Sequence, residues 1–272
     1  MIYAIISAMR QKIILSISNF YIQLNFYPTE WQFIRTRFKN KITTYFSGFV
    51  VNQNPNKIDY IIDFIERKDI TVIENNNSTN YYAMIYEEMN KRKMISFYHI
   101  SIFHFQLLLR LITQKLLMHN KGFLLHGSAN QINGKVNIFI GNEGAGKSTV
   151  IKLLRFHHPA QADDNVIIKK ENHSYFFYQT PFIEKEWWVK KNPSKYQINK
   201  IFFLRKARYT RIEKIEDKKY LLKRLVHHFW TDKKYYLMQV PYLFKFIDEF
   251  SGFYFLYFEK DKKNLLKAVS GN

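Results

Sequence analysis

Apolar residues recur along the chain at two kinds of spacing, which predict short strands in some segments and helices in others. In the first third, the runs at 12–17 and 70–73 have strand-like spacing, whereas 33–46 and 58–65 are compatible with helices. Residues 101–118 are a stronger helix candidate, because their apolar positions cover a wide face and Gly122 follows the last turn. We therefore expect a mixed α/β region over residues 1–98, followed by a separate domain over 99–272.

The second region predicts buried strands that alternate with helices. Strands are expected at 123–126 and 136–140, and Asn133-Gly134 between them is a strong signal for a tight β-hairpin. This turn would join a strand ending at Ile132 to the strand over 136–140. Further along, the pattern predicts strands at 166–168, 175–178 and 201–204, an amphipathic helix over 216–230, and aromatic strands over 235–258 with a break at Pro241.

The segment after the strand at 136–140 carries the most specific motif. Gly141-Asn142-Glu143-Gly144-Ala145-Gly146-Lys147-Ser148 fits the pattern G-x-x-x-x-G-K-[ST] of a phosphate-binding P-loop, and a predicted helix begins at Thr149. The glycines permit a tight turn whose N–H groups, with the helix N-terminus, can surround a phosphate chain. We expect Lys147 to reach the β- and γ-phosphates and Ser148 to ligate Mg²⁺. The alternative is a chance glycine-rich turn, which the flanking strand and helix disfavour. Residues 141–149 therefore predict binding of ATP and Mg²⁺.

Two consecutive carboxylates are the candidates for the second half of this site. Asp163 and Asp164 follow Ser148 closely enough to leave room for one helix and a tight return. One could hold the metal, while the other takes the proton from an attacking hydroxyl, and the sequence does not say which does which. The alternative is a solvated Asp-Asp-Asn turn. His126 is expected to end a strand antiparallel or adjacent to the one that feeds the P-loop, where it could lie near the γ-phosphate or serve only a structural role.

Charge and composition narrow the classes of partner. The formal net charge is +20, from 42 Lys and Arg against 22 Asp and Glu, which favours an anionic partner or reflects the codon bias of an AT-rich genome. Basic clusters occur, but none is long enough for a dedicated nucleic-acid arm, so a nucleic-acid partner is not expected. They lie at Arg205, Lys206, Arg208 and Arg211, and at Lys260, Lys262 and Lys263.

The chain contains no cysteine, which excludes disulfides, thiolate zinc sites and a cysteine nucleophile. Residues 1–15 are apolar but lack the order of charge, apolar core and cleavage site of a signal peptide. No apolar window approaches the length of a transmembrane helix. From these features we expect a cytoplasmic protein without a transmembrane segment.

Several of these segments together carry a family resemblance. Four segments occur in the same order, and at about the same spacing, as in the C-terminal domain of HPr kinase/phosphorylase, which the chain therefore resembles. They are Leu124-Leu125-His126-Gly127-Ser128-Ala129, Asn133-Gly134, the P-loop and Ala162-Asp163-Asp164. More narrowly, the chain resembles HPr-kinase-related proteins outside sugar regulation over about residues 120–250. The further shared features are Thr180-Pro181-Phe182, the apolar strand at 201–204 and Val240-Pro241-Tyr242. The Glu-Ile-Arg-Gly signature of true HPr kinases is missing, so we expect an acceptor other than HPr.

The resemblance implies a P-loop kinase core of the type shared by HPr kinases and phosphoenolpyruvate carboxykinases. It implies transfer from Mg·ATP to a hydroxyl group, typically a serine of a protein or of a ribosomally made peptide precursor. Lys147 and Ser148 would then handle the phosphates and the metal, and Asp163 or Asp164 would be the base with the other near Mg²⁺. His126 would lie by the transferred phosphoryl group. Relatives that act as oligomers leave a homo-oligomer open.

Two alternatives stand beside the kinase. The first is a non-catalytic nucleotide-binding or regulatory module that serves an anionic partner, and its binding should weaken steeply with salt. The second is a degenerate family member that acts as a scaffold, against which the intact Lys147, Ser148 and Asp163-Asp164 argue.

Overall fold

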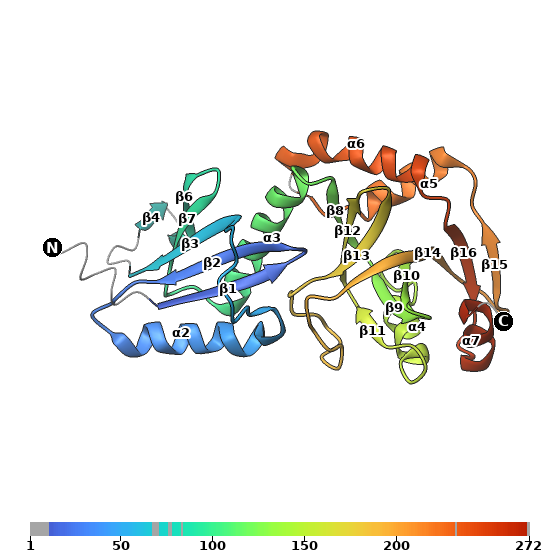
Figure 1. Cartoon of the computed structure of the whole chain (residues 1–272), viewed down its shortest axis with the longest axis horizontal. Coiled ribbons are helices and arrows are strands. Elements are labelled where there is room, and N and C mark those ends of the chain that lie inside the picture. Colours follow the sequence, from blue (N-terminus) through green and yellow to red (C-terminus); the bar gives the residue numbers. More distant parts are fainter. Residues whose placement is uncertain (1–10, 67–70, 76–77, 83, 232, 271–272) are drawn as a thin grey trace. The chain divides into compact units, whose positions relative to one another are not determined.

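The computed structural model describes residues 11–66, 71–75, 78–82, 84–231 and 233–270 (Figure 1). The chain separates into two compact units, an N-terminal unit over Met1–Ile112 and a C-terminal unit over Thr113–Asn272. This division falls inside helix α3 (Ile102–Met118), downstream of the boundary at residue 98 that the sequence suggests. Among the described residues, no helix is both long and apolar enough to cross a membrane.

The N-terminal unit is built on a five-stranded mixed sheet in the order β1-β2-β3-β7-β6. The central strands β2, β3 and β7 run parallel to one another, whereas β1 and β6 pair antiparallel at the edges. Helix α2 (Gln32–Tyr45) and a short 3-10 turn (Ser47–Phe49) connect β2 to β3. The strands are β1 (Gln11–Ile17), β2 (Phe20–Phe26), β3 (Tyr60–Ile65), β6 (Tyr86–Asn90) and β7 (Lys93–Phe97), and a separate ribbon pairs β4 (Thr71–Asn75) with β5 (Ser78–Tyr82).

Aromatic side chains fill the core of this unit. The ring of Phe38 on α2 lies 5.0 Å from that of Phe64 on β3 and 6.2 Å from that of Phe105 on α3. The expected strand at 12–17 and helix at 33–46 are confirmed by β1 and α2, while Ile70, in the strand expected at 70–73, lies outside the described residues. The helix considered at 58–65 is wrong, because this segment forms β3. A central strand buried on both faces has a continuous apolar run, which periodicity cannot distinguish from a short buried helix.

The C-terminal unit holds a larger sheet, of nine strands among the described residues. Strands β10, β14 and β16 run parallel, with β14 between the other two, and the remaining pairs are antiparallel. The strands are β8 (Gly122–His126), β9 (Ser128–Ile132), β10 (Lys135–Ile140), β11 (Ala160–Ala162), β12 (Asn165–Glu171), β13 (Ser174–Gln179), β14 (Lys195–Lys206), β15 (Arg211–Lys214) and β16 (Phe253–Phe258). Both sheets mix parallel and antiparallel pairs, which confirms the expected mixed α/β class.

Helices cover both faces of this sheet and make three layers (Figure 1). One face carries α5 (Lys218–His227) and α6 (Lys233–Glu249), whose Leu225 and Phe246 pack with Ile138 of β10. The other carries α4 (Lys147–Leu154) and α7 (Lys262–Ser270), which pack with Phe139 of the same strand. Because successive side chains of a strand point to opposite faces, β10 is buried on both sides, and this packing fixes the start of the glycine-rich turn that follows it.

Two expectations about this unit have opposite outcomes. The hairpin is confirmed: β9 and β10 pair antiparallel, and both Asn133 (φ 50°) and Gly134 (φ 75°) have positive φ, as a type I′ turn requires. The aromatic strands over 235–258 are largely wrong, because α6 extends to Glu249 with Pro241 inside it and only β16 is a strand. The buried positions Leu243, Phe246 and Ile247 follow helical spacing, and the many aromatic residues disguise it.

Candidate functional site

The turn between β10 and α4 has a backbone that two glycines make possible. Gly144 and Gly146 have φ values of 73° and 104°, in the left-handed region that side chains rarely enter. The N–H of Ala145 donates to the carbonyl of Asn142 at 3.0 Å, which closes the loop. Lys147, Ser148 and Thr149 then form the first turn of α4. The predicted P-loop segment therefore has the strand–turn–helix context that its sequence pattern requires.

Close packing also fixes the glycines at the two ends of this loop. A Cβ atom added to Gly141 would lie 2.7 Å from the Cβ of Ala145, and one added to Gly146 would lie 2.6 Å from the Cζ of Phe258. A Cβ on Gly144 would meet nothing within 4 Å, so its positive φ alone disfavours a side chain there. Loop geometry thus depends on the sheet, through Phe258 of β16, as well as on local turn chemistry.

The side chain of Lys147 folds back over the loop. Its Nζ donates to the carbonyl of Gly141 at 2.8 Å and to that of Asn142 at 3.3 Å. Burial lowers the pKa of Lys147, an effect that the nearby carboxylates of Asp164 and Asp163 oppose. The ammonium group is therefore held by two carbonyl oxygens at the mouth of the loop, where a phosphate chain could replace them as its partner.

Asp163 lies directly after β11 and is buried, with 4% of its surface exposed. Its side chain hydrogen-bonds to Ser148, and its N–H donates to Oε2 of Glu184 at 2.8 Å. Burial raises the pKa of Asp163, the hydrogen bond from Ser148 lowers it, and the carboxylates of Glu186 and Asp164 raise it. Its Oδ1 is buried and makes no hydrogen bond with a described residue. Asp163 thus contacts Ser148 at the start of α4 and has one oxygen without a hydrogen bond to a described residue.

Asp164 has different partners from its neighbour. Its Oδ1 lies 2.9 Å from Nδ1 of His126, and its Oδ2 accepts from the amide of Asn165 at 2.7 Å. The carbonyl of Asp164 accepts from the N–H of Gly127 at 3.0 Å, and the N–H of His126 donates to the carbonyl of His228 at 2.8 Å. Two adjacent carboxylates are thereby directed to two different groups, one to the P-loop helix and the other to an imidazole.

The position of His126 corrects one expectation. Strand β8 does not pair with β10, the strand that feeds the P-loop; it pairs antiparallel with β12, and His126 is opposite Asn165. The chain leaves β8 at Gly127 and enters β9, which is the strand that pairs with β10. Antiparallel pairing of β8 with β12 brings His126 beside Asp164, because Asp164 directly precedes Asn165. The expectation that His126 ends a strand paired antiparallel with, or adjacent to, β10 is therefore wrong.

Several charged residues at the site have no recognisable sequence signal. Glu184 is buried and forms an ion pair of 2.9 Å with Lys191, and burial raises the pKa of Glu184. Glu186 pairs with Lys152 of α4 at 2.7 Å and accepts from the indole N–H of Trp188, also at 2.7 Å. The only hint is that both glutamates lie shortly after Thr180-Pro181-Phe182, a segment already singled out by its sequence. Tertiary packing alone turns them toward Asp163 and α4.

His228 is a further buried residue at this site, and no motif in the sequence marks it. It is 5% exposed, and its Nε2 is buried without a hydrogen bond to a described residue. Burial lowers the pKa of His228 to about 4, and the positive charges of Arg224 and His227 act in the same direction. This imidazole is therefore neutral at physiological pH, beside the backbone that holds His126.

Two hollows flank the P-loop and share Asn142 and Glu143. The first encloses about 390 Å³ and is lined by His126, Gly141, Asn142, Glu143, His227, His228, Phe229 and Trp230. The second encloses about 290 Å³ and is lined by Asn142, Glu143, Gly144, Ala145, Leu204, Arg205, Lys206 and Arg224. His126 lines the first hollow and lies 2.9 Å from Asp164, which makes this hollow the candidate place for an acceptor.

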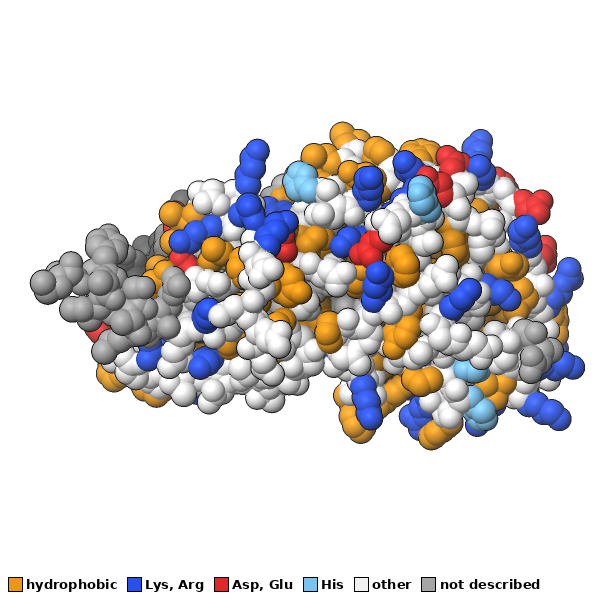
Figure 2. Space-filling model, in the orientation of Figure 1, with side chains coloured by type: hydrophobic (Ala, Val, Ile, Leu, Met, Phe, Trp, Pro, Cys, Tyr) orange, Lys and Arg blue, Asp and Glu red, His pale blue; other side chains and the backbone are white. Residues whose placement is uncertain are grey.

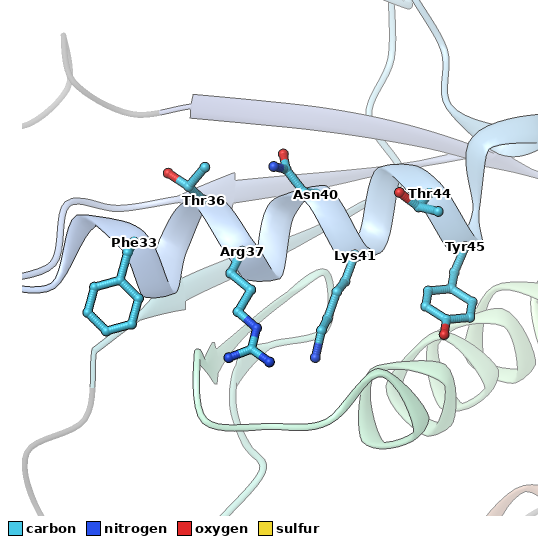
Figure 3. Close-up of a pocket in the computed structure, with 7 residues that line it drawn as sticks. All are labelled: Phe33, Thr36, Arg37, Asn40, Lys41, Thr44 and Tyr45. Atoms are coloured by element: carbon cyan, nitrogen blue, oxygen red, sulfur yellow. The ribbon is translucent and has the colours of Figure 1, made fainter.

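A larger hollow in the N-terminal unit has no such chemistry. It encloses about 510 Å³ along helix α2, and Phe33, Arg37, Lys41 and Tyr45 form one row of side chains beside it (Figure 3). All of its lining residues belong to this single helix, and none is acidic or a nucleophile activated by a neighbour. Among the described residues there is also no group of three or more His, Asp or Glu that could hold a metal ion by itself. The P-loop surroundings therefore remain the candidate site.

No family model matches the chain, and no curated protein matches it. Among solved structures, the chain is similar to the HPr(Ser) kinase/phosphatase from Coxiella burnetii, with 16% identity and a TM-score of 0.26 over 34% of this chain and 77% of that chain. A TM-score of this size does not establish a shared fold.

Proposed function

We propose that this protein is a kinase that transfers the γ-phosphoryl group of Mg·ATP to a hydroxyl group, most naturally a serine of a protein or of a ribosomally made peptide precursor. One observation carries the proposal. Asp163 hydrogen-bonds to Ser148 at the start of α4, while Asp164 lies 2.9 Å from His126. Two carboxylates with separate partners at the end of a P-loop are suited to the two tasks of phosphoryl transfer, metal binding and proton removal.

The donor side of the reaction would use the P-loop. Its N–H groups and the N-terminus of α4 would surround the phosphates, and Lys147 would exchange its two carbonyl partners for phosphate oxygens. Ser148 and Asp163 offer the hydroxyl and carboxylate oxygens that Mg²⁺ prefers, and the partnerless Oδ1 of Asp163 fits such a role. When bound, Mg²⁺ would neutralise charge on the β- and γ-phosphates.

The acceptor side would use Asp164. Its carboxylate would take the proton from the acceptor hydroxyl as that oxygen bonds to the γ-phosphorus and the bond to the β–γ bridging oxygen breaks. The electron pair of the broken bond leaves with ADP. His126, at 2.9 Å, would position this carboxylate, and the hollow beside it would admit the acceptor.

The experiment is transfer of labelled phosphoryl from γ-labelled ATP, with Mg²⁺, into fractionated extract of the source cells. We expect wild type to label a protein or peptide fraction, and Asp164→Asn to abolish labelling while it retains ATP binding. Asp163→Asn should lose transfer together with Mg²⁺-dependent nucleotide affinity. Unchanged transfer in both variants would sink the kinase proposal.

A second candidate is a non-catalytic nucleotide-binding module with an anionic partner. The observation that favours it is the charge, because Arg205, Lys206 and Arg224 surround the hollow next to the P-loop. In that case wild type would bind ATP and transfer nothing, and the Asp164→Asn variant would behave like wild type in every assay.

A further inference from the structure

Three cations meet beside the P-loop in the hollow of about 290 Å³. Arg205 and Lys206 end strand β14, and Arg224 lies on α5, so two separate elements bring positive charge to one place. Glu143 is the one acidic residue among those that line the hollow. Lys147 is not among its lining residues, and it already provides the cation that the triphosphate requires. The additional cations therefore point to a second anionic group.

One of the two arginines, Arg205, is held in place before any ligand arrives, and the other, Arg224, keeps unused donors. The guanidinium of Arg205 donates to the hydroxyl of Tyr220 at 2.7 Å and lies 5.3 Å from the ring centre of Phe255. The guanidinium of Arg224 reaches the side-chain oxygen of Asn142 only at 3.4 Å, and its Nε is buried without a hydrogen bond to a described residue. A fixed guanidinium with unused donors is well prepared for a carboxylate, which it can bind through two parallel hydrogen bonds.

The positive charge continues along the same stretch of chain. A second hollow of about 740 Å³ includes Arg208 and Arg211, which lie in the turn after β14 and at the start of β15, and Lys267 of α7. Only Ala207 separates Arg208 from Lys206 of the first hollow. Arg208 and Lys267 are both exposed, so a ligand can reach them. We name the combined surface the basic track; its residues are Arg205, Lys206, Arg208, Arg211, Arg224 and Lys267.

We propose that the basic track binds an acidic segment of the phosphoryl acceptor, so that the substrate is a protein or peptide with Asp or Glu residues near its hydroxyl group. This inference rests on the proposed kinase function. Its first hollow is lined by Asn142–Ala145, and its second hollow follows along the same stretch of chain beyond Ala207, where the flanking residues of an acceptor would lie. Its ligand is a set of separate carboxylates, each paired with one or two cations.

The spacing of acidic residues favours a peptide over a nucleic acid. Glu143 lies in the first hollow and Glu259 in the second, and Glu213 comes within 3.8 Å of Arg211. A phosphate backbone carries a charge at every nucleotide and would meet these carboxylates repeatedly. An acidic peptide can place neutral residues opposite them. Figure 2 shows the same mixture more broadly: on the face in view, Lys and Arg side chains are scattered and do not form one continuous stripe.

Binding can be tested without catalysis, by fluorescence anisotropy of a labelled serine peptide rich in glutamate. Its glutamine counterpart and an oligo-dT strand serve as comparison probes, all without nucleotide. We expect the glutamate peptide to bind wild type and to lose about tenfold in affinity in Arg205→Gln/Arg224→Gln. Arg208→Gln/Arg211→Gln should lose less, because Arg211 already has Glu213 nearby. The matched control is Lys219→Gln/Lys223→Gln, which removes the same charge from exposed positions of α5 and should change affinity less than about twofold.

Equal binding of the glutamate and glutamine peptides would overturn the proposal, as would equal losses in the control and the track variants. Tighter binding of oligo-dT than of the glutamate peptide would assign the track to nucleic acid and would also overturn it. Failure of the kinase proposal gives a different result: ATP binding or transfer would be missing while the peptide still bound. Conversely, transfer to a neutral peptide with no contribution from Arg205 or Arg224 would retain the kinase and remove the basic track.

Discussion

Each of the two units contains a buried aspartate, but only one of the two aspartates has partners for both of its carboxylate oxygens. In the N-terminal unit, Asp63 is 5% exposed, accepts from the amide of Asn25 at 2.7 Å and pairs with Lys93 at 2.8 Å. In the C-terminal unit, Asp163 is 4% exposed, and one of its oxygens makes no hydrogen bond with a described residue. Burial raises the pKa of Asp163. A carboxylate with complete partners is part of a scaffold, whereas one that is buried and incompletely satisfied indicates a functional site.

Other buried polar side chains of the C-terminal unit are also incompletely satisfied. Asn130, Thr180 and His228 each keep one side-chain atom that makes no hydrogen bond with a described residue. An atom of this kind reduces stability unless a ligand completes its hydrogen bonds.

The largest effect is expected from exchanging the P-loop lysine. Lys147→Met removes the ammonium group that would contact the phosphates, so affinity for Mg·ATP should fall by about 100-fold or more. Lys93→Met, in the N-terminal unit, should leave nucleotide affinity unchanged and lower the stability of the fold, because Asp63 loses its ion pair. Titration with a fluorescent ATP analogue measures the first effect and urea unfolding the second. Equal nucleotide affinity in wild type and Lys147→Met would contradict the site.

An effect of similar size is expected on the free energy of unfolding when the pH is lowered, and it should come from His228. Its pKa in the folded protein is about 4, below the ordinary value near 6.5, so the unfolded chain takes up a proton more readily. Stability contributed by the neutral imidazole is therefore complete above about pH 6.5 and is lost as the pH falls toward 4, by roughly 3 kcal/mol in total. His228→Phe should flatten this decline in urea unfolding, whereas His173→Asn, at an exposed histidine, should not. An unchanged slope in His228→Phe would show that this imidazole is not the buried group we describe.

The next largest effect is expected at two glycines with positive φ, Gly146 and Gly134, which can be compared directly. Gly146→Ala adds a Cβ that would lie 2.6 Å from Cζ of Phe258, whereas at Gly134 a Cβ meets nothing within 4 Å. Gly134→Ala should cost about 1 kcal/mol of stability from its backbone conformation alone. Gly146→Ala should cost about 2 kcal/mol or more and also weaken nucleotide binding. Similar stability and similar nucleotide affinity in the two variants would mean that the P-loop does not depend on contact with β16.

The smallest expected effect has the opposite sign. Because burial raises the pKa of Asp163, its ionised form at neutral pH is a cost to the fold, and Asp163→Asn should stabilise the protein by about 1 kcal/mol. This gain should shrink as the pH falls, because wild-type Asp163 then becomes neutral too. Asp63→Asn should instead destabilise, since it removes the ion pair of 2.8 Å with Lys93. Thermal unfolding without nucleotide measures both, and a loss of stability in Asp163→Asn would remove the contrast between the units.

Sequence reasoning succeeded where a few consecutive residues fix the backbone. Asn133-Gly134 specified its turn, and the segment 141–148 specified a glycine-dependent loop between a strand and a helix. It failed over 58–65 and over much of 235–258, where aromatic and β-branched residues suit a strand or a buried helix equally well. In those segments the surface on which the segment packs decides between helix and strand. For example, α6 is a helix because Leu243 and Phe246 then share one face that packs against the sheet.

The sequence by itself determined the conformations that are local, because the positive φ of Gly134, Gly144 and Gly146 depends on neighbours a few bonds away. It also named the carboxylates Asp163 and Asp164. Only the tertiary structure decided that Ser148 faces the first of these and His126 the second. Antiparallel pairing of β8 with β12 sets that arrangement, and strand pairing between distant segments follows from burial of the whole sheet.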